Sequence, residues 1–167
     1  MLKEIDIKTV DLNPFKKIGD DWALLMAGEK TSYNSMTISW GYMGVMCGKN
    51  VFLTVVRPQR YTKKFVDSSE YFTVSFFDDK YKKTLAYLGS HSGADVDKMN
   101  VEGMEAEFSD NSVYYKQASL VLVCKKLFSM EQSDAKFYDE ALKEEIYPTG
   151  DFHTFYTGEI VKAYINE

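Results

Sequence analysis

The chain has little cysteine, little proline and no long apolar run. Its 167 residues include two cysteines, Cys47 and Cys124. Two cysteines make neither a disulfide framework nor a zinc-ligand spacing, and Cys124 lies in an apolar run that favours a buried free thiol. A membrane-spanning helix needs about 20 apolar residues, and the chain has no such segment and no apolar signal region at its start. We therefore expect a cytoplasmic protein with no membrane partner.

Positive charge is also in deficit. The formal net charge is -5 at pH 7. A general nucleic-acid binder needs clustered, surplus lysine and arginine to neutralise phosphates. We therefore expect no nucleic-acid partner, and the importance of any basic residue has to be judged from its position.

Aromatic residues, by contrast, are abundant. They make up 15% of the chain, within an apolar share of 45%. Aromatic side chains suit strands and can stack on planar ligands. The length is that of one domain with a substantial core, so we expect a single domain over residues 1–167.

Alternation of apolar and polar residues predicts several strands. Over residues 34–40, Met36, Ile38 and Trp40 share one face and Thr37 and Ser39 share the other. A loop is expected where Gly41, Gly44 and Gly48 follow. Other strands are expected at 21–27, 51–56, 71–77, 113–115, 119–124 and 155–165, the last with a possible bulge at Gly158.

Helices are fewer. They are expected at 62–69 (capped by Thr62), 79–88, 96–99 and 134–146, the last with Phe137, Ala141 and Leu142 on its apolar side and Pro148 just past its end. Helices do not alternate regularly with strands, which disfavours a doubly wound parallel sheet. Short strands broken by glycine turns predict a mainly β fold, a β-barrel with helical insertions.

The predicted strand at 51–56 ends in two arginines. Arg57 and Arg60, with Pro58 shaping the turn, are spaced to converge on one anion, and Tyr61, Thr62 and Lys64 add donors beside them. The simpler alternative is a pair of surface arginines that bind carboxylates of this acidic protein.

The preceding strand shifts the balance toward a ligand. Thr37 and Ser39 share a face, where hydroxyls can bond the polar edge of a heterocycle. The alternative is a half-buried strand in which the threonine only packs. Together, the two segments favour a ligand with a flat ring at one end and a phosphate at the other.

Four segments resemble the flavin reductase-like family of FMN-binding split β-barrels, which includes flavoredoxin. They are Asn34-x-Met36-Thr37-Ile38-Ser39-Trp40-Gly41, Val56-Arg57-Pro58-x-Arg60-Tyr61-Thr62, the stretch from Ser90 to Lys98, and His153 upstream of Gly158-Glu159-Ile160. The family usually has a tryptophan followed by Lys-Pro after the position of Gly44. Here Met46-Cys47-Gly48-Lys49-Asn50 stands instead, a departure that bears on how this loop covers the flavin.

The resemblance implies a split-barrel fold, an FMN cofactor and a homodimer with the flavin near the subunit interface. It implies that Asn34, Met36, Thr37, Ser39 and Trp40 line the ring and ribityl part, that Arg57, Arg60, Tyr61, Thr62 and Lys64 bind the phosphate end, and that Ser90, Ser92 and Lys98 contribute from the third segment.

The two histidines are weighed separately. His153 is a candidate on the substrate side of the flavin, although a hydrogen-bonded turn residue is the more common state of such a histidine. His91 is expected in a loop. We find no catalytic triad, no paired catalytic carboxylates and no metal-ligand cluster, so neither a catalytic nor a metal-binding residue is predicted.

A flavoenzyme needs no such constellation, because the cofactor performs the hydride chemistry. The sequence has no GxGxxG element, so NAD(P)H would be a transient partner. The leading hypothesis is an FMN-dependent oxidoreductase that takes electrons from NAD(P)H or a redox protein. The alternatives are a flavoredoxin-like electron carrier and a flavin-binding protein without turnover.

Overall fold

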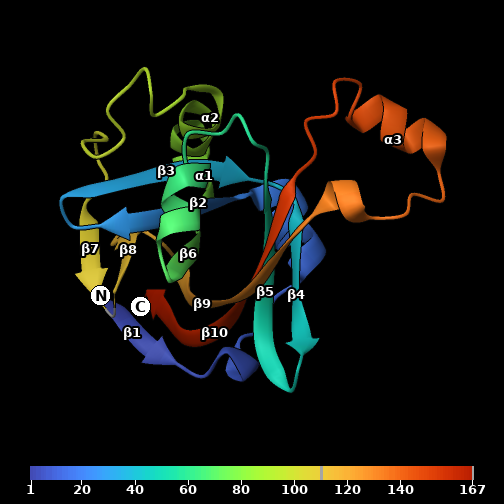
Figure 1. Cartoon of the computed structure of the whole chain (residues 1–167). Coiled ribbons are helices and arrows are strands. Elements are labelled where there is room, and N and C mark those ends of the chain that lie inside the picture. The colour runs from blue at the N-terminus through green and yellow to red at the C-terminus, as the bar shows by residue number, and fades with distance from the viewer. Residues whose placement is uncertain (110, 167) are drawn as a thin grey trace.

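A computed structural model describes residues 1–109 and 111–166, and the fold is mainly β, as predicted (Figure 1). The strands are β1 (Leu2–Ile5), β2 (Ala23–Glu29), β3 (Ser32–Ile38), β4 (Gly41–Met46), β5 (Lys49–Val56), β6 (Tyr71–Phe76), β7 (Ala106–Ser109), β8 (Ser112–Tyr115), β9 (Leu120–Glu131) and β10 (Thr154–Asn166). The α-helices are α1 (Lys63–Ser68), α2 (Lys82–Ser90) and α3 (Glu140–Ile146), and a π-helix spans Lys16–Asp21.

Eight of these strands form one antiparallel sheet that curls without closing. Its order is β3-β2-β6-β9-β10-β5-β4, with β1 also paired to β10. In the described part of the chain β3 and β4 stand at the two ends of this order and do not pair with each other. The sheet is therefore a split barrel, and the split lies between β3 and the β4–β5 hairpin.

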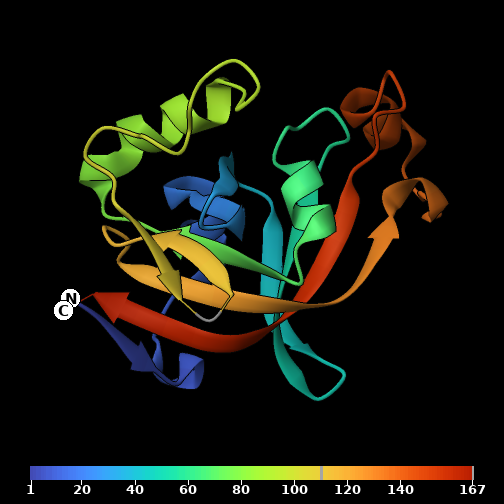
Figure 2. The same cartoon turned by 60° about the vertical axis from the view of Figure 1, so that its left-hand side comes forward.

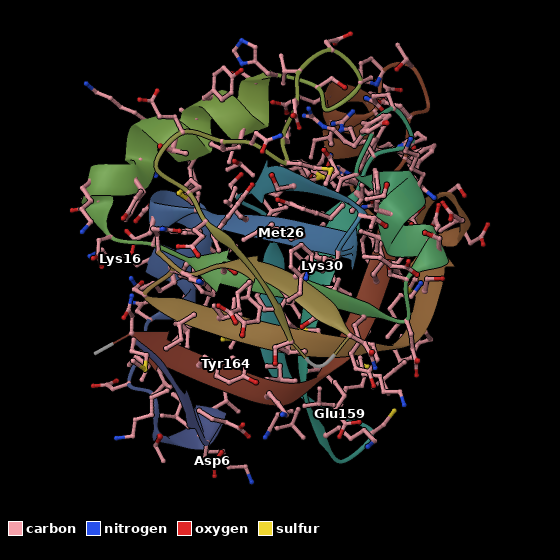
Figure 3. All side chains as sticks on the ribbon, turned by 90° about the vertical axis from the view of Figure 1, so that its left-hand side faces the viewer. Asp6, Lys16, Met26, Lys30, Glu159 and Tyr164 are labelled. Carbon is pink, nitrogen blue, oxygen red and sulfur yellow. The ribbon has the colours of Figure 1, made fainter. Side chains whose placement is uncertain are left out.

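Alternation along the central strands gives the sheet two buried faces. On β2, Leu25 and Ala27 belong to the core inside the curled sheet, whereas Leu24 and Met26 belong to the core on the other face. Met26 and Tyr164 of this second core are labelled in Figure 3. Because both faces are covered, these strands are almost continuously apolar rather than half polar.

The second face is covered by α2 and by the β7–β8 hairpin. Leu85 and Leu88 of α2 are buried there, together with Val113 and Tyr115 of β8. In Figures 1 and 2, α3 instead stands off from the sheet at the end of a long excursion between β9 and β10.

One predicted loop is a strand. Residues 41–46 form β4, which pairs with β5 through a turn at Cys47 and Gly48. Glycine lowers strand propensity, but pairing with the buried strand β5 overrides it here. Gly41 also has a structural reason to be glycine, because a Cβ there would lie 2.5 Å from the Leu53 carbonyl oxygen.

Two helix predictions need correction. Residues 96–99 form bends, without a helix. The helix predicted over 134–146 is limited to α3, and none of its residues is buried, so its apolar residues do not face the core. Leu142 is 46% exposed. The apolar residues do recur at helical spacing, but the helix stands off from the sheet and its apolar side has no sheet to pack on.

Two smaller predictions, the bulge at Gly158 and the buried thiol of Cys124, are confirmed. The register between β10 and β9 shifts at Thr157 and Gly158, so the bulge lies where it was expected. A Cβ at Gly158 would come within 2.8 Å of both Cys124 and the Phe72 ring. Cys124 is a buried free thiol, and burial raises its pKa. In the described part of the chain, no helix is long and apolar enough to cross a membrane.

Candidate functional site

Two adjoining pockets lie at the split of the barrel, and together they collect nearly all of the predicted site residues. The first, of about 250 Å³, is called here the Trp40 pocket, and the second, of about 210 Å³, the Lys98 pocket. They share Met36, Thr37 and Arg60. The Trp40 pocket adds Ile38, Ser39, Trp40, Val55, Arg57 and His153, and the Lys98 pocket is also lined by Asn34, Tyr61, Thr62, Ser90, Ser92, Asp95 and Lys98.

The fold brings these residues together because β3 and β5 lie on opposite sides of the split. Beyond β5 the chain makes two successive turns, in which the Arg60 N–H bonds the Arg57 carbonyl at 3.1 Å and the Lys63 N–H bonds the Arg60 carbonyl at 2.9 Å. These turns lead directly into α1. The segment from Arg57 to Thr62 is thereby held against the loop that follows α2.

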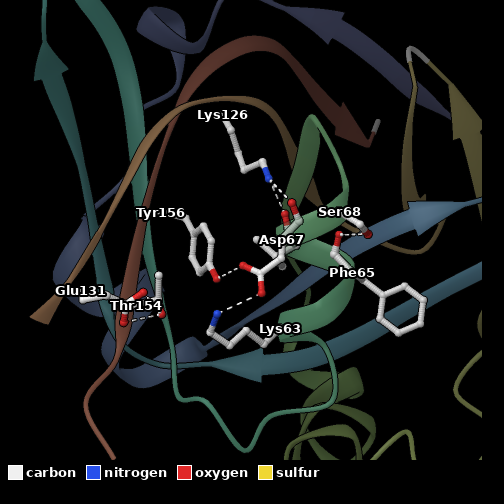
Figure 4. Close-up of polar contacts among 9 residues, drawn as sticks. Lys63, Phe65, Asp67, Ser68, Lys126, Glu131, Thr154 and Tyr156 are labelled. Atoms are coloured by element: carbon white, nitrogen blue, oxygen red, sulfur yellow. Dashed lines mark hydrogen bonds and ion pairs between the residues drawn. The ribbon is translucent and has the colours of Figure 1, made fainter.

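Helix α1 is in turn fixed to the sheet by a polar cluster, drawn in Figure 4. The Tyr156 hydroxyl of β10 donates to one Asp67 carboxylate oxygen, and Lys63 Nζ lies 2.9 Å from the other. Lys126 of β9 donates to the carbonyl oxygens of Val66 and Asp67 at 2.6 and 2.9 Å. Because Lys126 satisfies carbonyls at the end of α1, the cluster holds a short helix that could not persist alone.

Arg57 is already engaged by protein groups. Its guanidinium forms an ion pair with Asp151, donates to the Ile146 carbonyl at 3.0 Å and lies 5.2 Å from the centre of the Tyr147 ring. Bonds from Gln59 and from Arg57 hold the pKa of Asp151 well below its usual range. This is the carboxylate pairing that the sequence left open as an alternative, and it ties the turn after β5 to the segment before β10.

Arg60 and Lys98 form the cationic part of the site. Arg60 lines both pockets, and in the described residues its side chain has no ion pair. Lys98 is 4% exposed, and its Nζ donates to the carbonyl oxygens of Ser35 and Leu88 at 3.0 and 2.6 Å. Burial, and then the charge of Arg60, lower the Lys98 pKa to about 8. Two cations without a paired carboxylate create a strong field for an anion.

The hydroxyl groups of the site mostly bond to protein. Thr37 donates to the Leu85 carbonyl of α2, so toward a ligand it offers lone pairs rather than a proton. The Thr62 hydroxyl accepts from the Asn34 amide at 2.8 Å. Thr62 stands at the N-cap position of α1, as expected, but its side chain makes no capping hydrogen bond. Ser90 donates to carbonyl oxygens of its own helix, and Ser92 accepts from the Ala94 N–H.

Trp40 and His153 are neighbours in the lining of the Trp40 pocket, with their ring planes tilted by 44°. Trp40 is 48% exposed, and the ring centres are 5.3 Å apart. His153 is 7% exposed, and its Nδ1 lies 2.6 Å from the Tyr147 hydroxyl. Burial, followed by the charge of Arg57, lowers the His153 pKa to about 4. The imidazole is therefore neutral near pH 7.

Lys64 is the predicted residue that lies apart from both pockets. Its Nζ lies over the Tyr61 ring, 3.7 Å from the centre. The side chain is exposed.

A larger hollow of about 820 Å³ lies elsewhere, between the β2–β3 and β7–β8 turns. Its charged residues are Glu29, Lys30 and Glu70. None of the predicted site residues lines it. Size alone therefore does not identify the site, and the chemistry of the lining favours the two pockets at the split.

Three contributors to the site were not predicted from the sequence. Tyr147 and Gln132 lie in the excursion before β10, and no motif marks them; the nearest signal was the tyrosine beside Pro148. Gly93 lies within the stretch from Ser90 to Lys98, where only Ser90, Ser92 and Lys98 were predicted to contribute. A Cβ on Gly93 would lie 2.2 Å from the Asn34 side-chain oxygen, so this glycine lets the loop pack on the Asn34 side chain.

The fold and the pockets define a split-barrel protein whose site joins a cationic hollow to one lined by a tryptophan and a histidine. The model of the family described as "Flavin reductase like domain" matches residues 17–167. The chain belongs to this family. Among curated proteins, none matches the chain.

Solved structures agree on the fold. Flavoredoxin from Methanosarcina acetivorans has a TM-score of 0.69 at 23% identity, over 88% of this chain and 69% of that chain. An FMN-binding protein from Thermus thermophilus with bound p-hydroxybenzaldehyde has a TM-score of 0.67 at 20% identity, over 87% and 71%. The styrene monooxygenase flavin reductase from Pseudomonas putida S12 has a TM-score of 0.62 at 12% identity, over 88% and 80%.

Proposed function

We propose that this protein is an FMN-binding oxidoreductase that passes hydride or electrons from a donor such as NAD(P)H to an acceptor. The observation that supports this most strongly is the two-part site, with unpaired cations in one pocket and Trp40 with His153 in the adjoining one. A ligand that spans both pockets would have an anionic end and a planar end, as FMN does. Among structural relatives, a flavoredoxin and a flavin reductase share this fold.

The residues present fit such a ligand. Arg60 and Lys98 would hold the phosphate by charge-assisted bonds, with the hydroxyls of Ser90 and Ser92 on the wall of the same pocket. Met36, Thr37, Ser39 and Trp40 would hold the ring and ribityl part, with Asn34, Tyr61 and Thr62 beside them. A bound flavin would supply the hydride and electron transfer. The chain itself positions the ring, and Lys98 keeps a buried positive charge below its pKa of about 8.

A colour and bleaching experiment tests the proposal. The purified protein should be yellow, or become so with added FMN, and NADH or NADPH should bleach it under anaerobic conditions. A protein that takes up no FMN would contradict every flavin hypothesis. Bleaching by dithionite or a reduced ferredoxin, with none by either nicotinamide, would instead favour the electron carrier. Yellow protein that neither type of donor can reduce productively would favour binding without turnover.

We also propose a homodimer, and one exposed sheet face supports it. Tyr42 is 52% exposed, Phe128 41% and Met130 51%. The pairings place Tyr42 across from Leu53, Leu53 across from Thr157 and Thr157 across from Phe128. Paired residues share a face of an antiparallel sheet. Exposed Tyr42 and Phe128 therefore lie on one outer face of the sheet, with buried Leu53 and Thr157 between them. Exposed apolar side chains gathered on one face are typical of protein interfaces.

A further inference from the structure

The hydrogen bonds around His153 determine which ring nitrogen holds its proton. A tyrosine hydroxyl has one hydrogen to donate. Tyr147 donates that hydrogen to the side-chain carbonyl of Gln132. Toward His153 the same oxygen can therefore only accept, so the proton of the 2.6 Å contact resides on His153 Nδ1.

Neighbouring hydrogen bonds hold Gln132 in the position where its side-chain carbonyl accepts from Tyr147. The Gln132 backbone N–H bonds the His153 carbonyl at 2.9 Å, and Thr154 next to His153 bonds the Glu131 carboxylate at 2.9 Å. Figure 4 shows the Glu131–Thr154 pair at the end of β9. The Tyr147 ring is further packed by Phe152, with 4.7 Å between ring centres, and by the guanidinium of Arg57. The hydrogen-bonded series from Gln132 through Tyr147 to His153 is therefore held in place at both ends.

The remaining ring nitrogen, Nε2, is separated from Nδ1 by the single carbon Cε1, and its lone pair points in a widely different direction, away from Tyr147. His153 lines the Trp40 pocket, and within residues 1–109 and 111–166 no hydrogen bond to Nε2 occurs. The charged or titratable groups around the ring are Arg57 and Arg60 from the turn after β5, and Asp151 and Tyr147 from the segment before β10. Burial, followed by the charges of the two arginines, lowers the His153 pKa to about 4 and keeps the imidazole neutral.

We infer that Gln132 and Tyr147 are positioning residues that hold His153 in its Nδ1–H form, so that Nε2 accepts a hydrogen bond from a planar ligand bearing an N–H or O–H in the Trp40 pocket. The carboxamide of a nicotinamide is one ligand of this class. The role of Nε2 as an acceptor adds a substrate contact to the proposed function. Only the identity of the substrate rests on that proposed function. The protonation state itself does not depend on any cofactor.

The tautomer is measured on the cofactor-free protein by long-range ¹H–¹⁵N correlation of the imidazole. The chain has two histidines, so His91→Asn leaves His153 as the only signal. We expect a protonated Nδ1 and an unprotonated Nε2. Gln132→Leu should free the Tyr147 proton for Nδ1 and invert the tautomer, and Gln132→Glu, which keeps an acceptor, should preserve it. Tyr147→Phe should leave a mixture.

The acceptor role is tested in the same samples with phenol and its O-methyl ether, anisole. Phenol should shift the Nε2 resonance of the parent protein, whereas anisole and the Gln132→Leu variant should show no such shift. An Nε2–H tautomer in the parent, no inversion in Gln132→Leu, or equal shifts with both probes would overturn the inference. Failure to take up FMN would contradict the proposed function, and these spectra would still be readable.

A kinetic measurement complements them on the FMN-loaded protein. One lost hydrogen bond corresponds to roughly a three- to tenfold weaker interaction. Gln132→Leu should therefore raise KM for NADH by about that factor, with kcat much less affected, and Gln132→Glu should restore it. An inverted tautomer with an unchanged KM would overturn the substrate-side role.

Discussion

Arg57 and Arg60 are close in sequence, but their side chains have different surroundings. Arg57 is bound to Asp151 and to the Ile146 carbonyl, whereas Arg60 lines both pockets. The sequence could predict two arginines at the end of β5 but not their partners, because Asp151 is distant in the chain. The two residues therefore make separable contributions, which substitutions can distinguish.

We expect Arg60→Ala to weaken FMN binding by about 1.5–3 kcal/mol, the range for a lost hydrogen bond to a charged group. Riboflavin lacks the phosphate and should be affected far less. Arg57→Ala should weaken both ligands to a similar degree, because it releases the segment that contains Asp151. Fluorescence titration with the two flavins measures both effects. An equal loss for both flavins in Arg60→Ala would contradict a phosphate contact.

Lys98 should make phosphate binding depend on pH. Its pKa is lowered to about 8, so the side chain loses its charge as the pH rises through that value. Since the phosphate monoester keeps both charges above its second pKa of about 6, FMN affinity should be full just above neutral pH and fall as the pH rises through about 8. The measurement is FMN affinity against pH, with riboflavin as the ligand control and Lys98→Met as the protein control. Both controls should be flat in this window, and a parallel decline in Lys98→Met would exclude Lys98 as the cause.

Gly93 should tolerate no side chain. A Cβ there would lie 2.2 Å from the Asn34 side-chain oxygen, and Asn34 is buried and bonded to Thr62. Gly93→Ala should destabilise the fold by about 1–3 kcal/mol, the usual cost of overpacking, and should weaken FMN binding as well. Gly19→Ala is the matched control, because nothing lies within 4 Å of a Cβ at that position. Denaturant unfolding measures the difference, and equal stabilities would refute the argument.

At the scale of elements, α1 depends on side chains from the sheet. Burial raises the pKa of Asp67, but the bonds from Tyr156 and Lys63 outweigh it and leave the pKa below its ordinary value. A carboxyl group with a lowered folded-state pKa stabilises the protein above its unfolded pKa, and this contribution disappears as the pH falls. The cluster in Figure 4 is therefore acid-sensitive.

Tyr156→Phe removes the hydroxyl that bonds Asp67 and should destabilise the fold by about 0.5–1.5 kcal/mol near neutral pH. The loss should begin to shrink as the pH falls below the ordinary carboxyl pKa of 3.8, and it should vanish below the lowered folded-state pKa, where Asp67 is protonated in both proteins. Unfolding free energy against pH measures this, with Tyr42→Phe on the exposed β4 as the control. A loss that did not change with pH would mean that Tyr156 acts by packing alone.

The elements that sequence could predict are those whose pattern and surroundings agree. The alternation at β3 and β6 and the apolar run at β9 are enough to predict these strands. Each of them packs where its pattern requires, either against both cores or between one core and the split of the barrel. The helix at 134–146 was over-extended, because periodicity reports an apolar stripe but not whether anything covers it. The strand β4 was missed, because its stability comes from pairing with β5 rather than from its own glycine-containing residues.

The same reasoning applies to the site. Asn34 to Trp40 and Arg57 to Thr62 could be joined from sequence because their residue types suit two ends of one ligand. Tyr147 and Gln132 could not, because their roles come from the approach of the β9 end to the segment before β10. That approach is a property of the sheet register, with Glu131 paired to Thr154.

At the scale of the whole molecule, the outer face of the sheet should decide the oligomeric state. Phe128→Lys and Met130→Lys place charge at two exposed apolar positions on this face, so each should shift the protein from dimer toward monomer. Light scattering after size-exclusion chromatography measures the mass. Tyr87→Lys on α2, which replaces another exposed aromatic residue, is the control and should leave the mass unchanged. A monomer in every sample would contradict the proposed dimer.

The position of β10 has a consequence for how the protein is made. In the described part of the chain, β10 alone connects the β3-β2-β6-β9 half of the sheet to the β5–β4 hairpin. Until the ribosome has released Thr154 to Glu159, β5 has no strand that joins it to β9. The nascent chain thus exposes two half-sites, one with Thr37 and one with Arg60. It can acquire a ligand that spans both pockets only after residues 154–159 have emerged and paired with both strands.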